Sequence, residues 1–357
     1  MERGKLRVDV IGAGIIAEPY GRELMAEPDI EIVGIGDALT ERAEVLAAKL
    51  GVPAFASVDA LLADSSVDAV VNLTVQRAHA EVNTRILQMG KHAYSEKPLA
   101  MSYADAQGLV ALADRCGARI ACAPSTFMGE AQQTAWKLIR EDRIGTVRVA
   151  YAEVNWGRME SWHPAPEAYY DTGVMPDVGI YPLSILTAIF GPARRVRAYG
   201  KVILPERVTK KGEAFQVTIP EFVIAVIELA SGTVARLTAN WYVDQRHTRQ
   251  AGMEFHGDRG SIVLDSWLEA DAAVYLAEPG AGLQPVPLVR PVQRGVVWSR
   301  AVPELARAIA EGRPHRASGE HAAHLVEIMD AVGTSISSGW PVEVTSSFVP
   351  PAPMEWA

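Results

Sequence analysis

A short strand-like segment that runs directly into a glycine turn constrains the fold of this chain most strongly. Leu6–Ile11 has the length and character of a strand, and Gly12-Ala13-Gly14-Ile15-Ile16-Ala17 follows it. Apolar residues with helical spacing then continue over Ile16–Met25. In such a unit the first glycine permits the tight turn, the second lets a ligand approach the backbone, and the small third residue lets helix and strand pack closely. The pattern predicts an α/β unit with backbone N–H groups exposed at the start of its helix.

The same alternation of strands and helices continues to about residue 125. Further strands are expected at Ile30–Ile35, Ala69–Leu73, His92–Ser95 and Ile120–Ala123, and helices at Thr40–Lys49, Ala78–Met89 and Tyr103–Cys116. Repeated units of this length predict a doubly wound parallel sheet of the Rossmann type, covered by helices on both faces.

From about residue 145 the sequence favours a different architecture. Strands are expected at Val147–Val154, Phe222–Glu228, Thr233–Trp241, Gly252–His256 and Ser261–Leu264, and helices at Val178–Phe190, Arg300–Glu311 and His321–Ser337. Short turns join these strands, which is typical of a largely antiparallel sheet. We therefore expect an α/β domain over residues 1–124 and an α+β domain with an open-faced sheet over 125–357, whose tail could return to the first domain.

Composition excludes several classes of function. The 34 Lys and Arg against 43 Asp and Glu give a formal net charge of −9, which disfavours nucleic acid or an anionic membrane as the main partner. No apolar run reaches the roughly 18–20 residues of a membrane helix. With only two cysteines, a reduced cytoplasm is the expected setting. The eight histidines lack metal-ligand spacing, so no metal site is expected.

An acidic residue at the end of the second strand specifies what the glycine turn could bind. Asp37 follows Gly34-Ile-Gly36, about one βα unit downstream of the turn. A carboxylate there accepts hydrogen bonds from two ribose hydroxyls and repels a 2′-phosphate. The two features predict a dinucleotide site that favours NAD over NADP. Arg42 in the next helix could soften that preference, or it could simply be a solvated surface residue.

The fourth strand runs into Ser95-Glu96-Lys97-Pro98. Lys97 would therefore lie at the carboxyl end of a parallel strand, the edge where doubly wound sheets bind ligands. A lysine in that crevice can hydrogen-bond a substrate hydroxyl and help move its proton. A surface lysine in an ordinary turn is the alternative.

Together with the Leu73-Thr74 strand end and His79, these motifs resemble the Gfo/Idh/MocA family, named for glucose–fructose oxidoreductase and inositol dehydrogenase. The resemblance covers nearly the whole chain and includes Gly145 and Asp177-Val-Gly179-Ile-Tyr181. It implies hydride transfer between NAD(P) and a secondary alcohol of a sugar, inositol or related polyol, and a cis peptide before Pro98. The cofactor-binding residues that it implies are Gly12, Gly14, Ile15, Ile16, Asp37, Arg42, Leu73, Thr74, Val75, His79, Glu96, Lys97 and Pro98.

The second domain departs from the family pattern at two places. Gly173-Val174-Met175-Pro176 replaces most of a glycine run, and Tyr181 stands where many members have a catalytic histidine. The tyrosine resembles members in which a phenol carries the proton. The resemblance thus implies Lys97, Asp177 and Tyr181 as catalytic residues, with Lys97 as the cation beside the phenol and Asp177 orienting it. A helix N-cap for Asp177 and a packed aromatic for Tyr181 are the alternatives.

The segment after the first long strand of the second domain is rich in aromatic residues. Trp156, Trp162 and His163 are candidates for substrate binding, with Asp177 and Tyr181, because aromatic faces stack on sugar rings. They could equally be core aromatics, and His163 is a second candidate proton carrier.

Two other functions stay open at this point. Some relatives use NAD for a transient oxidation and hydrolyse a glycosidic bond without net redox change, and a non-catalytic dinucleotide-binding sensor is also compatible. The resemblance further implies a homodimer or homotetramer formed through the C-terminal sheet. The particular sugar, the carbon and the direction of reaction do not follow from the sequence.

Overall fold

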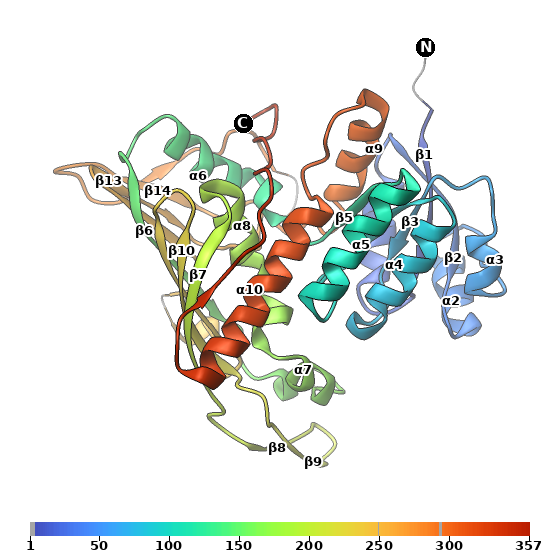
Figure 1. Cartoon of the computed structure of the whole chain (residues 1–357), viewed down its shortest axis with the longest axis horizontal. Coiled ribbons are helices and arrows are strands. Elements are labelled where there is room, and N and C mark those ends of the chain that lie inside the picture. Colours follow the sequence, from blue (N-terminus) through green and yellow to red (C-terminus); the bar gives the residue numbers. More distant parts are fainter. Residues whose placement is uncertain (1–3, 249, 293–294) are drawn as a thin grey trace. The chain divides into compact units, whose positions relative to one another are not determined.

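The computed structural model describes residues 4–248, 250–292 and 295–357 (Figure 1). The chain packs as two compact units: unit 1 comprises Met1–Ser125 and Val297–Val326, and unit 2 comprises Thr126–Val296 and Glu327–Ala357. The sequence suggested one boundary near residue 124. It did not predict that residues 297–326 pack with unit 1. The unit boundary falls within helix α10, Gly319–Ser338.

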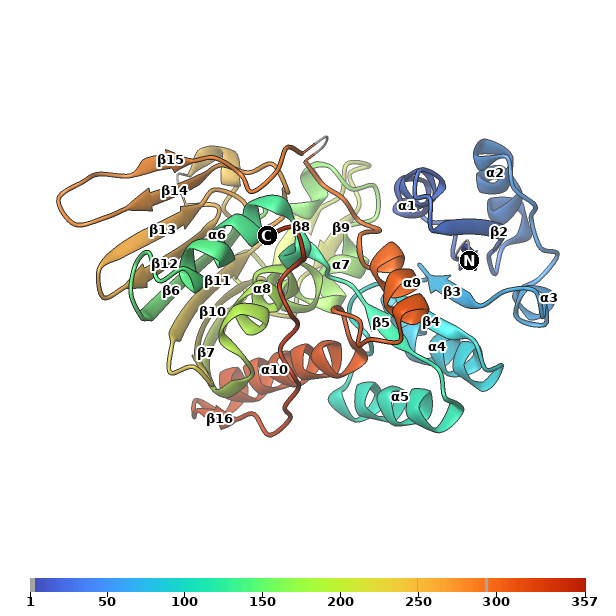
Figure 2. The same ribbon diagram turned by 90° about the horizontal axis from the view of Figure 1, so that it is seen from above.

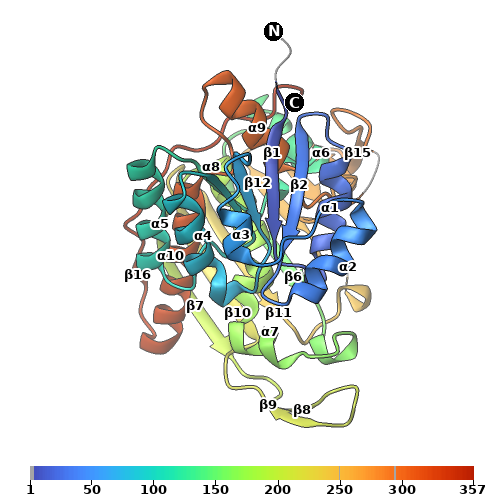
Figure 3. The ribbon, with the colours of Figure 1, turned by 90° about the vertical axis from the view of Figure 1, so that its right-hand side faces the viewer.

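Unit 1 contains the predicted parallel sheet. Its strand order is β2-β1-β3-β4-β5 and every neighbouring pair is parallel, which confirms the doubly wound α/β class. The strands are β1 (Leu6–Ile11), β2 (Ile30–Gly36), β3 (Ala69–Asn72), β4 (His92–Ser95) and β5 (Ile120–Cys122). The helices between them are α1 (Ala17–Met25), α2 (Thr40–Leu50), α3 (Val58–Leu62), α4 (His79–Gln88) and α5 (Tyr103–Cys116), and Figure 3 shows this unit with β1 and β2 facing the viewer.

The central strands have the burial expected of a sheet that is covered on both faces. All four residues of β3 are buried, as are five of the six in β1. Helix α1 buries a stripe of Ala17, Tyr20, Gly21 and Leu24, spaced as one helical face. Apolar burial on both sides of β1 and β3 therefore fixes the position of the turns that follow these strands.

Contacts with β5 explain why residues 297–326 belong to unit 1. Helix α9 (Ala301–Glu311) packs against β5, and its buried Glu304 binds Arg313 at 2.5 Å and Arg316 at 2.8 Å. The backbone of Cys122 in β5 donates to the carbonyl oxygen of Ala317 at 3.0 Å. The ion pairs hold this segment in shape, because a buried carboxylate with two guanidinium partners is costly to separate. The contacts with β5, including His315 Nε2 at 3.0 Å from the carbonyl oxygen of Ile120, attach the segment to the parallel sheet.

Unit 2 is built on a nine-stranded sheet of order β15-β14-β13-β12-β6-β11-β10-β7-β16, which can be followed in Figure 2. The neighbours are antiparallel except β6 and β11, which confirms a largely antiparallel sheet. The strands are β6 (Val147–Asn155), β7 (Ala193–Lys201), β10 (Phe222–Leu229), β11 (Val234–Asn240), β12 (Met253–Gly257), β13 (Gly260–Leu264), β14 (Val274–Ala277), β15 (Gln284–Val286) and β16 (Val342–Glu343). A separate hairpin pairs β8 (Glu206–Val208) with β9 (Ala214–Gln216).

Burial alternates along the central strands of this sheet. In β10, Val223, Ala225, Ile227 and Leu229 are buried, whereas the residues between them are half-buried or exposed. One face is therefore the core of unit 2 and the other is open, as an alternating pattern predicts.

The described helices of unit 2 are α6 (Glu130–Arg140), α7 (Glu167–Thr172), α8 (Ile180–Phe190) and the part of α10 from Glu327 onward. A π-helical turn over Met175–Gly179 precedes α8, so the α-helix begins two residues later than the sequence suggested. The chain's tail packs within unit 2: Phe348 and Met354 are buried, and the backbone of Met354 donates to Gln133 of α6 at 3.0 Å. Within the described ranges, no helix combines the length and apolarity needed to cross a membrane.

Asp9 in the middle of β1 is a buried carboxyl group that lacks a hydrogen bond of normal geometry. Burial, together with the nearby charge of Asp64, raises its pKa to about 7, although Lys91 and the N–H of Gly34 oppose the shift. The folded chain therefore keeps a proton that the unfolded chain releases near its ordinary pKa of 3.8. As pH rises from about 4 to about 7, this group progressively lowers the free energy of unfolding. Above that range its contribution to the free energy of unfolding no longer changes with pH.

We predict that Asp9→Asn raises the free energy of unfolding at pH 8 by about 3 kcal/mol more than it does at pH 4.5. Denaturant titrations of both proteins at the two pH values measure this difference. Asp114→Asn, at an exposed position in α5, is the matched control. The same pH dependence in both variants would contradict the assignment to Asp9.

Candidate active site

The glycine turn lies against the end of β3. Gly12 has φ +101°, and a Cβ atom on it would lie 2.5 Å from the carbonyl oxygen of Leu73. Both the backbone angle and the contact exclude larger residues there. A Cβ on Gly14 would instead meet no atom of the described chain within 4 Å, so space lies beside this part of the backbone.

The start of α1 is open to a ligand. Its N-cap residue is Ile16, and no side chain in the described structure caps the helix. Ile15 before it is 76% exposed, whereas Ala17 is fully buried against the strand. Uncapped N–H groups and the positive end of the helix dipole make this a position suited to a phosphate.

Asp37 is bound to the same turn. Its Oδ2 accepts the N–H of Ala13 at 2.7 Å, and its Oδ1 accepts the N–H of Leu39 at 2.8 Å. These bonds hold the carboxylate at the end of β2, and each oxygen keeps a further lone pair for another donor. Arg42 lies exposed in the first turn of α2.

Buried polar side chains connect the ends of β3 and β4. Asn72 accepts the N–H and Oγ1–H of Thr74 at 3.2 and 2.7 Å, and its amide donates to Asn83 at 2.9 Å. Asn83 in turn donates to Oγ of Ser95 at 2.9 Å. Neither Asn72 nor Asn83 was singled out from the sequence, although an asparagine directly after three apolar strand residues was a signal. The network fixes the two turns that follow these strands.

His79 also joins two turns. Its Nδ1 lies 2.7 Å from the carbonyl oxygen of Pro98, and its Nε2 lies 3.1 Å from that of Thr74. The ring is 1% exposed, and burial lowers the pKa of the imidazole. The buried histidine thus holds the turn at Thr74 and the turn at Pro98 together through their backbone carbonyl groups. Val75, which lies between Thr74 and His79 in the sequence, is 74% exposed.

The turn after β4 carries Glu96, Lys97 and Pro98, and the Lys97–Pro98 peptide is cis, as the resemblance implied. Glu96 Oε1 accepts the phenol of Tyr20 at 2.5 Å, and Oε2 accepts the N–H of Lys97 at 3.0 Å. The side chains of Glu96 and Lys97 are both half-buried. Thus β2, β1, β3 and β4, adjacent in the sheet, all carry candidate residues at their carboxyl ends.

In unit 2, Tyr181 belongs to a row of aromatic rings. Its ring centroid lies 5.4 Å from that of Trp267, which lies 5.8 Å from that of Trp156. The indole N–H of Trp267 donates to the carbonyl oxygen of Glu153 at 3.1 Å, which fixes the middle ring. Asp177 lies in the π-helical turn just before Tyr181, and both side chains are nearly buried. The sequence analysis missed Trp267.

Trp162 and His163 form a different aromatic group. Both contact the ring of Tyr169, with centroids 6.4 and 4.6 Å away respectively. His163 is almost buried, and its Nδ1 accepts the N–H of Ala165 at 3.1 Å, whereas Trp162 is 49% exposed. Ring contacts therefore place Trp156 with Tyr181 and place Trp162 and His163 with Tyr169.

A buried ion cluster holds the segment between these groups. The guanidinium of Arg207, fully buried on β8, binds Glu160 and Glu221 at 2.8 Å each. Tyr170 donates to Glu160 at 2.6 Å and accepts from Arg207 at 2.8 Å. Burial raises the pKa of the Tyr170 phenol, so it stays a donor. The cluster ties the 156–172 segment to the β8–β9 hairpin.

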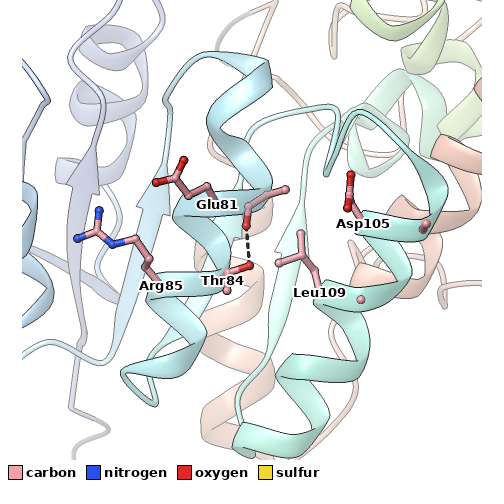
Figure 4. Close-up of a pocket in the computed structure, with 8 residues that line it drawn as sticks. Glu81, Thr84, Arg85, Asp105 and Leu109 are labelled. Atoms are coloured by element: carbon pink, nitrogen blue, oxygen red, sulfur yellow. Dashed lines mark hydrogen bonds between the residues drawn. The ribbon is translucent and has the colours of Figure 1, made fainter.

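A surface pocket of about 380 Å³ lies between α4 and α5 (Figure 4). Two of the three charged side chains that line it already have partners: Arg85 binds Asp59, and Asp105 accepts from Ser102 at 2.7 Å. Thr84 donates to the backbone of Ala80 at 2.8 Å, so its hydroxyl also has a partner. None of the candidate cofactor residues lines this pocket, and we assign it no role. In the described parts of the chain, no group of three or more His, Cys, Asp or Glu could hold a metal ion.

Comparison with known proteins identifies the family. Residues 6–123 match the oxidoreductase family with an NAD-binding Rossmann fold, and residues 132–263 match the GFO/IDH/MocA C-terminal domain. A reductase of Streptomyces antibioticus is 31% identical over 281 residues, which cover 74% of this chain and 84% of the reductase. The chain belongs to the Gfo/Idh/MocA oxidoreductases. The resemblance seen in the sequence is therefore confirmed.

Individual members of the Gfo/Idh/MocA family differ in what they act on. The Streptomyces antibioticus protein is named dTDP-3,4-didehydro-2,6-dideoxy-alpha-D-glucose 3-reductase. Inositol 2-dehydrogenase of Rhizobium meliloti is 23% identical over 266 residues, 73% of this chain and 76% of its own. Among solved structures, a levoglucosan dehydrogenase complex with NADH and levoglucosan has a TM-score of 0.84 at 21% identity, covering 95% of this chain and 99% of its own. That likeness shows the common fold.

We predict that Arg207→Met lowers the free energy of unfolding by about 3–5 kcal/mol, because it leaves Glu160 and Glu221 without their buried cation. Arg195→Met is the control, since Arg195 forms exposed pairs with Glu228 and Glu343 and should cost less than about 1 kcal/mol. Denaturant unfolding of the three proteins makes the comparison. Equal, small losses in both variants would show that the cluster does not hold unit 2 together.

Proposed function

We propose that this oxidoreductase transfers a hydride between NAD and a secondary alcohol of a sugar, inositol or related polyol. The observation that carries the proposal is the joint placement of the glycine turn, Asp37 and Glu96-Lys97-Pro98 at the carboxyl ends of adjacent parallel strands. Relatives named for a deoxysugar nucleotide reductase and an inositol dehydrogenase support the substrate class.

The residues of the strand ends fit a dinucleotide. The open space at Gly14 and the uncapped start of α1 would hold the pyrophosphate, and Asp37 would accept the ribose hydroxyls. The negative charge of Asp37 favours NAD over NADP. When bound, the nicotinamide supplies the hydride acceptor or donor. The other residues that we assign to cofactor binding are Gly12, Ile15, Ile16, Arg42, Leu73, Thr74, Val75, His79, Glu96, Lys97 and Pro98.

Tyr181 and Lys97 would handle the proton of the alcohol. In the oxidative direction the hydroxyl proton passes to Tyr181 Oη, and the ammonium of Lys97 stabilises the phenolate that receives it. Asp177 would orient Lys97. The stacking of Trp267 on Tyr181 supports this role, because it limits the directions in which the phenol can point.

The aromatic groups of unit 2 would bind the substrate. Trp156 and Trp162 offer ring faces for a sugar, and His163, Asp177 and Tyr181 offer polar atoms for its hydroxyls. In this proposal residues 1–124 hold the dinucleotide, and residues 125–357 hold the substrate and form a homodimer or homotetramer through the open sheet face.

A panel of sugars, sugar acids and inositols, assayed with NAD and NADP side by side, tests the proposal. We expect NADH absorbance to rise with at least one polyol, more efficiently with NAD than with NADP. Lys97→Met and Tyr181→Phe should each lower kcat about 100-fold on that substrate, because each removes a proton-handling group.

Other outcomes would redirect the assignment. Cleavage of a glycoside without net NADH formation would replace the dehydrogenase with a redox-neutral hydrolase. Unchanged turnover in Lys97→Met would remove the role of the lysine, and dinucleotide binding without turnover of any compound would favour a sensor. Equal use of NADP would contradict the role of Asp37.

A further inference from the structure

A buried tyrosine connects the helix after the glycine turn to the turn that carries Lys97. Tyr20 lies in the buried stripe of α1 and is fully inaccessible to solvent. Its hydroxyl donates to Glu96 Oε1 at 2.5 Å and lies 2.9 Å from the hydroxyl of Tyr94 on β4. Neither tyrosine has a part in the function proposed above.

The direction of these bonds follows from the number of protons. The phenol of Tyr20 has one proton and uses it in the hydrogen bond to the Glu96 carboxylate. Tyr94 must therefore donate its own proton to the oxygen of Tyr20. Burial and the nearby charge of Glu96 raise the pKa of Tyr20 well above 10. Tyr20 therefore stays a donor across the working pH range, and the bond from Tyr94 strengthens its donation.

This donation completes the fixation of Glu96. Its Oε1 binds Tyr20, its Oε2 accepts the N–H of Lys97 at 3.0 Å, and its own N–H donates to the carbonyl oxygen of Asn72 at 2.8 Å. Strand β3 lies between β1 and β4 in the sheet. Among the residues that the structure describes, backbone hydrogen bonds connect the glycine turn to the Lys97 turn through β3, whereas the Tyr20 side chain joins α1 to the Lys97 turn directly.

We propose that Tyr20 is a positioning residue that sets the Glu96–Lys97 turn relative to the helix that would hold the pyrophosphate. A dinucleotide contacts both ends of this link at once, so its affinity depends on their spacing. The inference rests on the proposed function for the role of the dinucleotide, but not on the identity of the alcohol.

The test is a titration of the full chain with NADH, followed by fluorescence, alongside thermal unfolding without dinucleotide. Tyr20→Phe removes the bond to Glu96, and we expect the Kd for NADH to rise about tenfold. Tyr94→Phe is the matched control, because it removes a hydroxyl from the same cluster and leaves the Tyr20–Glu96 bond in place. Its Kd should change less than threefold, or about 0.65 kcal/mol.

The double variant Tyr20→Phe, Tyr94→Phe separates positioning from stability. It removes both hydroxyls of the Tyr20–Tyr94 contact, so its midpoint of thermal unfolding should recover the part of the loss in Tyr20→Phe that comes from the Tyr94 hydroxyl. The Kd for NADH should stay tenfold high, because Glu96 still lacks the bond from Tyr20. Recovery of NADH affinity along with stability would overturn the proposal, as would a Tyr20→Phe variant with wild-type affinity. A wild-type chain that binds NADH but oxidises no polyol would instead contradict only the proposed function.

Discussion

The contact between Gly12 and the end of β3 is the constraint on which the candidate cofactor site depends. The turn can pass this close to the Leu73 carbonyl only because position 12 has no side chain and adopts a positive φ. With the turn in this place, Ala13 reaches the carboxylate of Asp37, and α1 begins with its N–H groups uncapped. One glycine thus sets the positions of the groups that would meet the phosphates and the ribose.

Buried polar side chains fix the positions of the other turns at this edge of the sheet. Asn72 and Asn83 join the turns after β3 and β4, and Tyr20 joins α1 to Glu96. A buried polar group must be satisfied, so each of these bonds restricts the turns to one arrangement. In unit 2 the same part is played by Trp267, which fixes the ring of Tyr181, and by the ion cluster around Arg207.

Periodicity was enough to predict most of unit 1, because its central strands are buried on both faces and a glycine follows three of its helices, at Gly51, Gly90 and Gly117. The strand Leu6–Ile11 and the helix Tyr103–Cys116 were predicted with the bounds that the structure has. Elements with weaker patterns were missed, including α6, whose buried face contains polar residues, and the exposed strand β7. Trp267 could not be assigned to Tyr181, because 86 positions separate residues that only the folded sheet brings together. The same holds for Tyr20, which reads as an ordinary core residue of α1.

The affinity of Gly12→Ala for NADH, measured by calorimetry, tests the central constraint most directly. The added methyl group must displace the end of β3, and we expect binding about 100-fold weaker, equivalent to about 2.7 kcal/mol, with the circular dichroism spectrum unchanged. Gly51→Ala provides the comparison, because Gly51 also has a positive φ, at +71°, but a Cβ there would meet no atom of the described chain within 4 Å. It should bind NADH as the wild type does. A folded Gly12→Ala chain with wild-type affinity for NADH would contradict the account.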